Sequence, residues 1–351
     1  MYAAFKKHRL NFIRPGGTSR GVLRSKDSWF IIISDFGFQI SDFQQTGLPE
    51  NLKIGVGECS IIPNLSIDDV PALEKIISQT VEQVNENNSS FALHSALKNF
   101  PALRFAFETA FLDFENGGTR TLFPSAFTRG EASIPINGLI WMGSFDGMWQ
   151  QAQQKVKDGF SVLKMKVGAL AFDEELYFIS QLRKAFPHIE LRLDANGGFP
   201  SGEALERLQA LAQFNIHSIE QPIQHGNISQ MATLCRRSPI DIALDEELIG
   251  IFDAKQKNEL LQKIKPQYII LKPSLLGGFR ACDEWISIAG KQHIRWWATS
   301  ALESNIGLNA IAQWTFTKNN PLPQGLGTGG VFSNNVALGL KVENGFLSLR
   351  T

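Results

Sequence analysis

The sequence predicts an α/β protein, a (β/α)7β TIM-like barrel with an N-terminal α+β capping domain. Short apolar runs end in a charged residue at gaps of 28, 26, 25 and 27 residues, at Lys166, Asp194, Glu220, Asp245 and Lys272. One strand-plus-helix unit takes about 30 residues, so these gaps indicate successive βα units. The N-terminal third lacks this period, so we predict that it forms a separate domain.

Residues 1–125 are predicted to form the capping domain, which the C-terminal residues 335–351 would complete. DSWFIIISDFGFQI and LKIGVGECS are rich in aromatic and β-branched residues and are split by turn formers, which is typical of strands. From Ser66 onward, apolar residues recur at three- and four-residue spacing, which predicts helices. Ser66 and Asp68 are expected to cap the first of these helices.

Residues 126–334 are predicted to form the barrel. Its strands are expected at SIPINGLI, at SVLKMKVG, and near 190–194, 216–220, 240–245, 268–272, 294–299 and 322–327. The C-terminal ends of parallel barrel strands meet on one face, where barrel enzymes place their chemistry. The tail VALGLKVENGFLSLR is expected to form a closing strand pair that returns to the cap.

Composition narrows the class of function. Lys+Arg and Asp+Glu are equal at 34 each, which argues against nucleic-acid and membrane-surface partners because no basic field exists. Cys59, Cys235 and Cys282 are scattered without a CxxC pair and indicate reduced thiols. No stretch approaches about 20 uninterrupted apolar residues. We expect a soluble cytoplasmic protein that acts on a small molecule; the sequence carries no signal for its oligomeric state.

Three carboxylates on consecutive strand ends, Asp194, Glu220 and Asp245, predict a divalent-metal site. Mg²⁺ prefers hard oxygen ligands and keeps coordination positions for water or substrate oxygens. No histidine accompanies the three carboxylates, which disfavours zinc. We therefore expect Mg²⁺, with Mn²⁺ as a substitute ion. The alternative is that each carboxylate only caps the helix after its strand, which explains one such residue better than three in a row.

Lysines flank these carboxylates. Lys164 and Lys166 are two residues apart on a strand, so both project to the same side. Inside a barrel they would repel each other and lose solvation, which lowers a lysine pKa toward the value that a general base needs. An exposed strand edge is the alternative. Lys272 keeps the period of the carboxylates and is a second candidate acid/base group, or else a solvated strand terminus. Arg192 alternates in phase with Asp194 and is expected to compensate the charge of the carboxylates, with direct contact to the substrate as the alternative.

Two glycine-rich stretches remain. Pro15–Gly21 carries one cation, Arg20, and is either a lid that closes over an anionic substrate or an ordinary hairpin loop. Gly325–Gly330 follows the last expected strand, where barrels often bind phosphate through backbone amides. A tight turn would also recruit these glycines.

Together these residues resemble the enolase superfamily, in its muconate-lactonizing-enzyme-like subgroup, over nearly the whole chain. The motifs that carry the resemblance are Lys164-Met165-Lys166, Asp194 within LDANGG, Glu220 within IEQP, Asp245 within LDEE and Lys272 within ILKPS. The resemblance implies that Mg²⁺ holds a substrate carboxylate. It also implies removal of the proton α to that carboxylate and an enediolate stabilised by the metal.

Within the subgroup, GGTSRGVLRSKDSWF, GECSIIPNLS and GLGTGG resemble the o-succinylbenzoate synthase family of menaquinone biosynthesis. The implied reaction is a syn dehydration of 2-succinyl-6-hydroxy-2,4-cyclohexadiene-1-carboxylate to o-succinylbenzoate. Lys166 would move the protons, Lys164 would stabilise the enediolate and Lys272 would place its charge on the opposite face. The residues expected to contact the substrate are Thr18, Ser19, Arg20, Asn196, Ser300, Gly327 and Thr328.

The same residues bear on the other activities of the subgroup. Dipeptide epimerases carry an Asp-x-Asp on the eighth strand, whereas Gly325–Gly330 holds no carboxylate. The mandelate-racemase branch would need a histidine at the end of the seventh strand, and His293 stands at its start. N-succinyl or N-acylamino-acid racemization stays open and would require Lys272 to transfer a proton. A cycloisomerase, a phosphate-binding barrel enzyme and a non-catalytic metabolite-binding barrel are the remaining alternatives.

Overall fold

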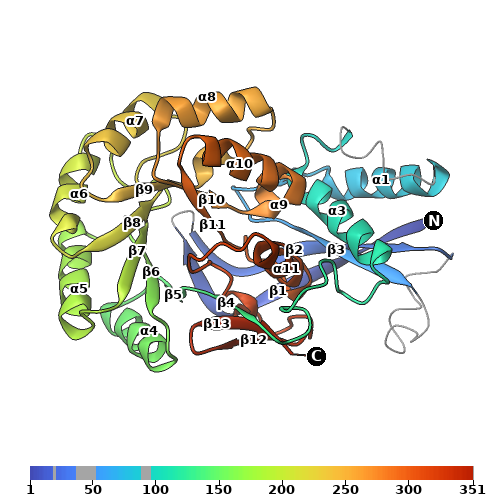
Figure 1. The fold of residues 1–351 in the computed structure, drawn as a ribbon, viewed down its shortest axis with the longest axis horizontal. Coiled ribbons are helices and arrows are strands. Elements are labelled where there is room, and N and C mark those ends of the chain that lie inside the picture. The colour runs from blue at the N-terminus through green and yellow to red at the C-terminus, as the bar shows by residue number, and fades with distance from the viewer. Residues whose placement is uncertain (19–20, 37–52, 88–95, 351) are drawn as a thin grey trace.

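The protein consists of a curled parallel sheet ringed by helices, with an antiparallel N-terminal sheet beside it (Figure 1). The computed structural model describes residues 1–18, 21–36, 53–87 and 96–350. In Figure 1 the helices from α4 to α8 form an outer arc around the parallel strands, and the cap with α1 and α3 lies on the other side. The predicted barrel with an N-terminal cap is confirmed.

The cap is a three-stranded antiparallel sheet covered by helices. Its elements are β1 (Tyr2–Thr18), β2 (Gly21–Ser34), β3 (Ile54–Ser60), α1 (Leu73–Asn87) and α3 (Pro101–Glu115), with the strands in the order β1-β2-β3. Helix α3 packs directly on β3 because glycines leave room for its backbone. A Cβ at Gly55 would lie 2.0 Å from the carbonyl oxygen of Ala110, and one at Gly57 would lie 1.9 Å from that of Ala106.

The prediction that Ser66 and Asp68 cap the first helix is wrong. Asp68 instead caps a later helix, α3. Helix α1 begins at Leu73, and Ser66 lies in the turns before it. The two carboxylate oxygens of Asp68 accept hydrogen bonds from the backbone N–H groups of Ala102, at 3.1 Å, and Leu103, at 3.0 Å. Asp68 therefore satisfies the free N–H groups at the start of α3, across a stretch of chain that a local motif does not span.

The barrel follows the predicted alternation. The short strand β4 (Ser133–Pro135) comes first and belongs to a separate sheet. The barrel strands are β5 (Gly138–Ile140), β6 (Val162–Lys166), β7 (Glu190–Asp194), β8 (Ile216–Glu220), β9 (Asp241–Leu244), β10 (Tyr268–Leu271) and β11 (Arg295–Ala298). Its helices are α4 (Phe145–Lys157), α5 (Phe172–Ala185), α6 (Ala204–Ala212), α7 (Ile228–Arg237), α8 (Ala254–Ile264), α9 (Pro273–Leu276), α10 (Phe279–Lys291) and α11 (Asn305–Thr317). Strands β5 to β11 lie parallel in sequence order, so their C-terminal ends share one face.

The eighth expected strand, 322–327, is reduced to single bridges that close the ring. Parallel bridges join Gln324 to Ile136 on one edge of the sheet and Gly325 to Thr299 on the other. The prolines of PLPQG have no N–H to donate to a ladder, which prevents a regular strand. The two edges of the parallel sheet are therefore joined by single bridges rather than by a regular eighth strand.

The C-terminal tail forms the expected hairpin. Strands β12 (Leu340–Glu343) and β13 (Phe346–Leu349) pair around a turn in which Asn344 has a φ of 51° and Gly345 a φ of 76°. Strand β13 also pairs with β4, while Asn334 hydrogen-bonds to the backbone of β1. The division into a cap of 1–125 with 335–351 and a barrel of 126–334 stays a proposal.

Two smaller expectations concern cysteines and membrane segments. Cys59, Cys235 and Cys282 are free thiols, and all are buried. Among the helices in the described part of the chain, none combines the length and apolar character that crossing a membrane requires.

Asp68 gives a testable pH dependence of stability. Burial raises its pKa from 3.8 to about 6, against the opposing effect of the two backbone hydrogen bonds. The folded state therefore holds this proton more tightly than the unfolded chain does. The associated stability is present below pH 3.8 and is lost as the pH rises through about 6.

We expect Asp68→Asn to remove this dependence. The free energy of unfolding of wild type minus that of Asp68→Asn should fall by up to about 3 kcal/mol between about pH 4 and about pH 7. Urea unfolding at both pH values measures this, with Asp69→Asn at the exposed neighbouring position as control. A difference that is the same at both pH values would contradict the assignment.

Candidate active site

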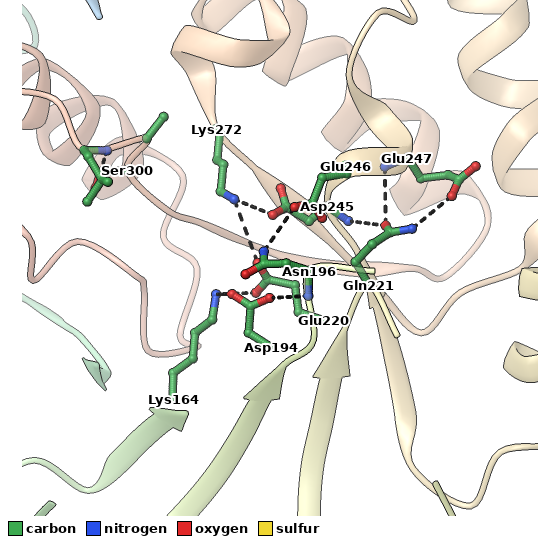
Figure 2. A network of polar contacts seen from close by, with 12 residues as sticks. Lys164, Asp194, Asn196, Glu220, Gln221, Asp245, Glu246, Glu247, Lys272 and Ser300 are labelled. Carbon is green, nitrogen blue, oxygen red and sulfur yellow. Dashed lines mark hydrogen bonds and ion pairs between the residues drawn. The ribbon is translucent and has the colours of Figure 1, made fainter. Parts of the chain in front are cut away.

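The strand ends bring the predicted charged residues together. Lys166 pairs in register with Asp194, and Asp194 pairs with Glu220, so these three side chains leave adjacent strands at the same level. Asp245 and Lys272 follow directly after β9 and β10. Figure 2 shows the side chains of the three carboxylates, Lys164 and Lys272 converging on one spot at the barrel's C-terminal face.

Lysine ammonium groups lie between the carboxylates. Lys164 Nζ is 2.6 Å from Glu220 Oε2 and 2.9 Å from Asp194 Oδ2. Lys272 Nζ donates a hydrogen bond to Asp245 Oδ2 and lies 3.9 Å from Glu220 Oε1. The three carboxylate side chains are at most 3% exposed. The buried carboxylates are therefore paired with lysine ammonium groups, as burial of charge requires.

The carboxylates determine the protonation of this cluster. Burial would lower the pKa of Lys164, but the charges of Asp194 and Glu220 outweigh it and raise that pKa. The expectation that repulsion from its neighbouring lysine would lower it is therefore wrong for Lys164. Burial also opposes ionisation of Asp194, yet the surrounding lysines lower its pKa. Burial and repulsion by Asp194 raise the pKa of Glu220 to about 8.

Lys166 is held by a neighbouring amide. Its Nζ donates to Asn196 Oδ1 and lies 3.5 Å from Asp194 Oδ2. Asn196 has a φ of 42°, and its own side-chain N–H donates to Glu246 Oε1 at 3.0 Å. Because Glu246 accepts from the amide nitrogen, the amide oxygen faces Lys166. Asn196, expected to contact substrate, thus contacts the candidate base.

Sequence reasoning missed a second layer behind the carboxylates. Gln221 is fully buried, and its Oε1 accepts the backbone N–H groups of Asp245, at 3.2 Å, and Glu247, at 3.3 Å. Its Nε2 donates to Glu247 Oε2 at 3.0 Å (Figure 2). This network fixes the backbone at Asp245. Gln221 stands in the motif IEQP and Glu247 in the motif LDEE, each after a predicted metal ligand. This position beside a predicted ligand was the sequence signal that could have identified them.

A cavity of about 750 Å³ opens over this cluster. Its lining includes several of the expected site residues, namely Lys164, Lys166, Asp194, Asn196, Lys272, Ser300, Gly327 and Thr328. Ser300 Oγ and Thr328 Oγ1 are 2.5 Å apart, so the loop after β11 is joined to the glycine-rich segment.

The hairpin formed by β1 and β2 also lines this cavity. Phe12, Ile13, Arg14 and Pro15 line it from the hairpin, and Trp141 lines it from the end of β5. Of the residues expected to bind substrate from this hairpin, Thr18 belongs to β1, but its side chain, like Ser19 and Arg20, lies outside the described residues.

Arg192 does not contact the carboxylates as expected. Its Nε donates to Glu190 Oε1 at 2.8 Å, and its Nη1 donates to the carbonyl oxygen of Pro323 at 2.8 Å. The guanidinium lies 4.5 Å from the ring centroid of Trp297. The glutamate two residues earlier on the same strand, which the sequence argument did not consider, takes the ion pair. Arg192 therefore belongs to the packed interior of the barrel.

The donor chemistry of the cluster suits a hard divalent cation. Within residues 1–18, 21–36, 53–87 and 96–350, no group of three or more His, Cys, Asp or Glu side chains is arranged to hold a metal ion. Lysines occupy the space between the carboxylates instead. Glu220 Oε1 is buried and accepts no hydrogen bond from any described residue. This buried oxygen without a donor is a position that a cation can satisfy, so the residues present fit Mg²⁺ once the lysines withdraw.

Comparison with known proteins places the chain in a family. The model of the enolase C-terminal domain-like family matches residues 147–351. The chain belongs to the enolase superfamily. It is 42% identical to an o-succinylbenzoate synthase of Desulfotalea psychrophila over 380 aligned residues, which cover 99% of each chain. The resemblance inferred from the motifs is thereby confirmed.

Solved structures agree with this placement in the enolase superfamily. The crystal structure of MenC from Desulfotalea psychrophila matches with a TM-score of 0.81 and 39% identity, covering 99% of both chains. A dipeptide epimerase from Enterococcus faecalis, solved with Mg and the dipeptide L-Leu-L-Tyr, matches with a TM-score of 0.77 over 99% of this chain and 96% of its own. That epimerase is 20% identical, so its likeness concerns the fold alone.

Proposed function

We propose that this protein is a hydro-lyase that dehydrates 2-succinyl-6-hydroxy-2,4-cyclohexadiene-1-carboxylate to o-succinylbenzoate in menaquinone biosynthesis. The observation that carries the proposal is the 42% identity to an o-succinylbenzoate synthase over 99% of each chain. The cavity supports it, because Lys164, Lys166 and Lys272 all line it beside buried carboxylates. From the composition we also propose that the protein is cytoplasmic and that its partner is a small molecule.

Asp194, Glu220 and Asp245 are proposed to hold Mg²⁺, with Mn²⁺ as a substitute. Support comes from their hard oxygen donors on consecutive strand ends and from the Mg bound to the Enterococcus faecalis epimerase. Lys164 and Lys272 would then turn away from the carboxylates toward the cavity. When bound, Mg²⁺ would supply Lewis-acid stabilisation of negative charge on the substrate carboxylate.

Lys166 is the proposed acid/base group. Its neutral Nζ takes the proton from the carbon α to the substrate carboxylate, and the electron pair of that C–H bond moves onto the carboxylate and then returns to form the new ring double bond. The bond from the ring to the hydroxyl group then breaks, and the ammonium of Lys166 returns the proton so that water leaves. Asn196 Oδ1 holds Nζ in place for both transfers. Lys164 and Lys272 supply positive charge on either side of the ring.

Racemization of N-acylamino acids is the second candidate. One geometric observation favours it, because Lys166 and Lys272 come from β6 and from the end of β10 and line one cavity. Two acid/base groups from separated strands are what a racemase needs, since the proton must leave one face and return to the other. Dehydration requires proton transfer by Lys166 alone.

The 16–21 loop of the β1–β2 hairpin is proposed to close over bound substrate. Phe12, Ile13 and Arg14 already line the cavity from the hairpin, and Arg20, outside the described residues, would stand near an anionic group. Ser300, Gly327 and Thr328 are proposed to complete the binding surface on the barrel side.

Replacement of a proposed metal ligand tests the metal site. Glu220→Gln should weaken Mg²⁺ binding and reduce turnover by at least about a hundredfold, because one of three anionic donors is lost. Calorimetric titration with Mg²⁺ and an absorbance assay with the cyclohexadiene acid measure the two effects. Glu174→Gln, on the exposed side of α5, is the matched control. Normal turnover of Glu220→Gln, or of wild type in excess EDTA, would refute the metal assignment.

The two lysines separate dehydration from racemization. Lys166→Ala should abolish dehydration and stop exchange of the α-proton with solvent deuterium. Lys272→Arg keeps the positive charge but cannot lose its proton, so it should retain measurable dehydration and lose any racemization. Absorbance, deuterium incorporation and optical rotation with N-succinyl amino acids measure the three activities. Robust dehydration by Lys166→Ala would defeat the mechanism, and racemization by Lys272→Arg would defeat the two-base side reaction.

A further inference from the structure

The loop after β11 forms part of the cavity wall in an unfavourable backbone conformation. Ser300, Ala301 and Leu302 all line the cavity. Leu302 has a φ of 59°, a left-handed conformation that a leucine rarely adopts. Such a conformation persists only where surrounding contacts impose it, and these are often at functional sites. The contacts that impose it here are therefore informative.

A buried lysine of the cap holds this loop. Lys26 lies on β2 and is 3% exposed. Its Nζ donates to the carbonyl oxygens of Leu302, at 2.8 Å, and Ala301, at 3.2 Å. The third hydrogen bond goes to Ser60 Oγ on β3, at 2.5 Å. All three N–H donors of the ammonium group therefore make hydrogen bonds, and two of these bonds are to the loop after β11.

Two buried glutamates fix the same segment. Glu303 accepts the backbone N–H of Ala301 at 2.8 Å and the hydroxyl of Ser274 at 2.5 Å. Glu58, on β3 of the cap, accepts the backbone N–H groups of Ser304, at 2.9 Å, and Gly307, at 3.0 Å, and so caps α11. Both glutamates are fully buried and supply the negative charge that buried Lys26 needs.

We propose that Lys26 is a positioning residue, which makes the cap set the shape of the substrate cavity by holding the carbonyl groups of Ala301 and Leu302. Lys26 is not among the residues that line the cavity, so it acts through the loop. The inference rests on the proposed function for the choice of substrate. A lysine that only joined the cap to the barrel would affect stability but leave the kinetic constants of the folded protein unchanged.

Lys26→Met keeps the aliphatic stem and removes all three donors. We expect it to raise KM for the cyclohexadiene acid and lower kcat/KM on the order of tenfold or more, because a displacement of about 1 Å in a binding wall has effects of that size. Ser60→Ala is the matched control, since it removes one partner of Lys26 and leaves both contacts to the loop. It should lower the melting temperature while its kinetic constants stay within about twofold of wild type.

Hydrogen–deuterium exchange gives a readout that does not depend on the proposed substrate. Peptides covering 299–304 should exchange faster in Lys26→Met than in wild type and should be unchanged in Ser60→Ala. If wild type fails to turn over, the proposed function fails, and exchange still decides the role of Lys26. Should Lys26→Met not fold, Lys26→Arg applies the same test, because its planar fork cannot meet the same three acceptors. Kinetic constants and exchange equal to those of Ser60→Ala would overturn the proposal.

Discussion

Repulsion among carboxylates buried at adjacent strand ends is the constraint on which the rest of the site depends. Asp194 and Glu220 leave neighbouring parallel strands at the same level, and Asp245 follows on the next strand. Burial prevents water from screening them, so compensating charge has to come from the protein or from a bound cation. Lys164 and Lys272 lie against them for this reason, and Glu220 Oε1 still accepts no hydrogen bond from any described residue.

The same constraint separates the roles of the lysines. Lys164 and Lys272 are paired directly with carboxylates, and these pairs raise the pKa of both. They are suited to supply charge while the carboxylates surround them. Lys166 instead makes its shortest contact with the neutral amide oxygen of Asn196. Of the three, it is the lysine whose nearest partner is neutral, which is the position expected of a group that must gain and lose a proton.

Local patterns predicted the parts of this structure that depend on a few neighbouring residues. The regular spacing from Lys166 to Lys272 was sufficient to place five charged residues on one face, because each strand end is set by its own βα unit. Features that depend on contacts between distant segments were missed. Asp68 caps a helix beyond the next one, and the eighth strand is replaced by bridges at Gln324 and Gly325.

The contact of Lys26 with the loop after β11 is of this second kind. Its acceptors at Ala301 and Leu302 are backbone carbonyl groups on another domain, and a carbonyl group leaves no signature in the sequence. The roles of Glu58 and Glu303 can likewise be recognised only when the position of the cap on the barrel is known. The residues proposed to do the chemistry were therefore more predictable than the residues that hold them in position.

A crystal structure grown with Mn²⁺ and o-succinylbenzoate, with anomalous scattering recorded at the manganese edge, tests the central claim most directly. We expect one strong anomalous peak bonded to Asp194, Glu220, Asp245 and a product carboxylate, with Lys164 Nζ withdrawn from Glu220. An ion bound elsewhere, or Lys164 still bridging Asp194 and Glu220 at saturating Mn²⁺, would contradict this claim.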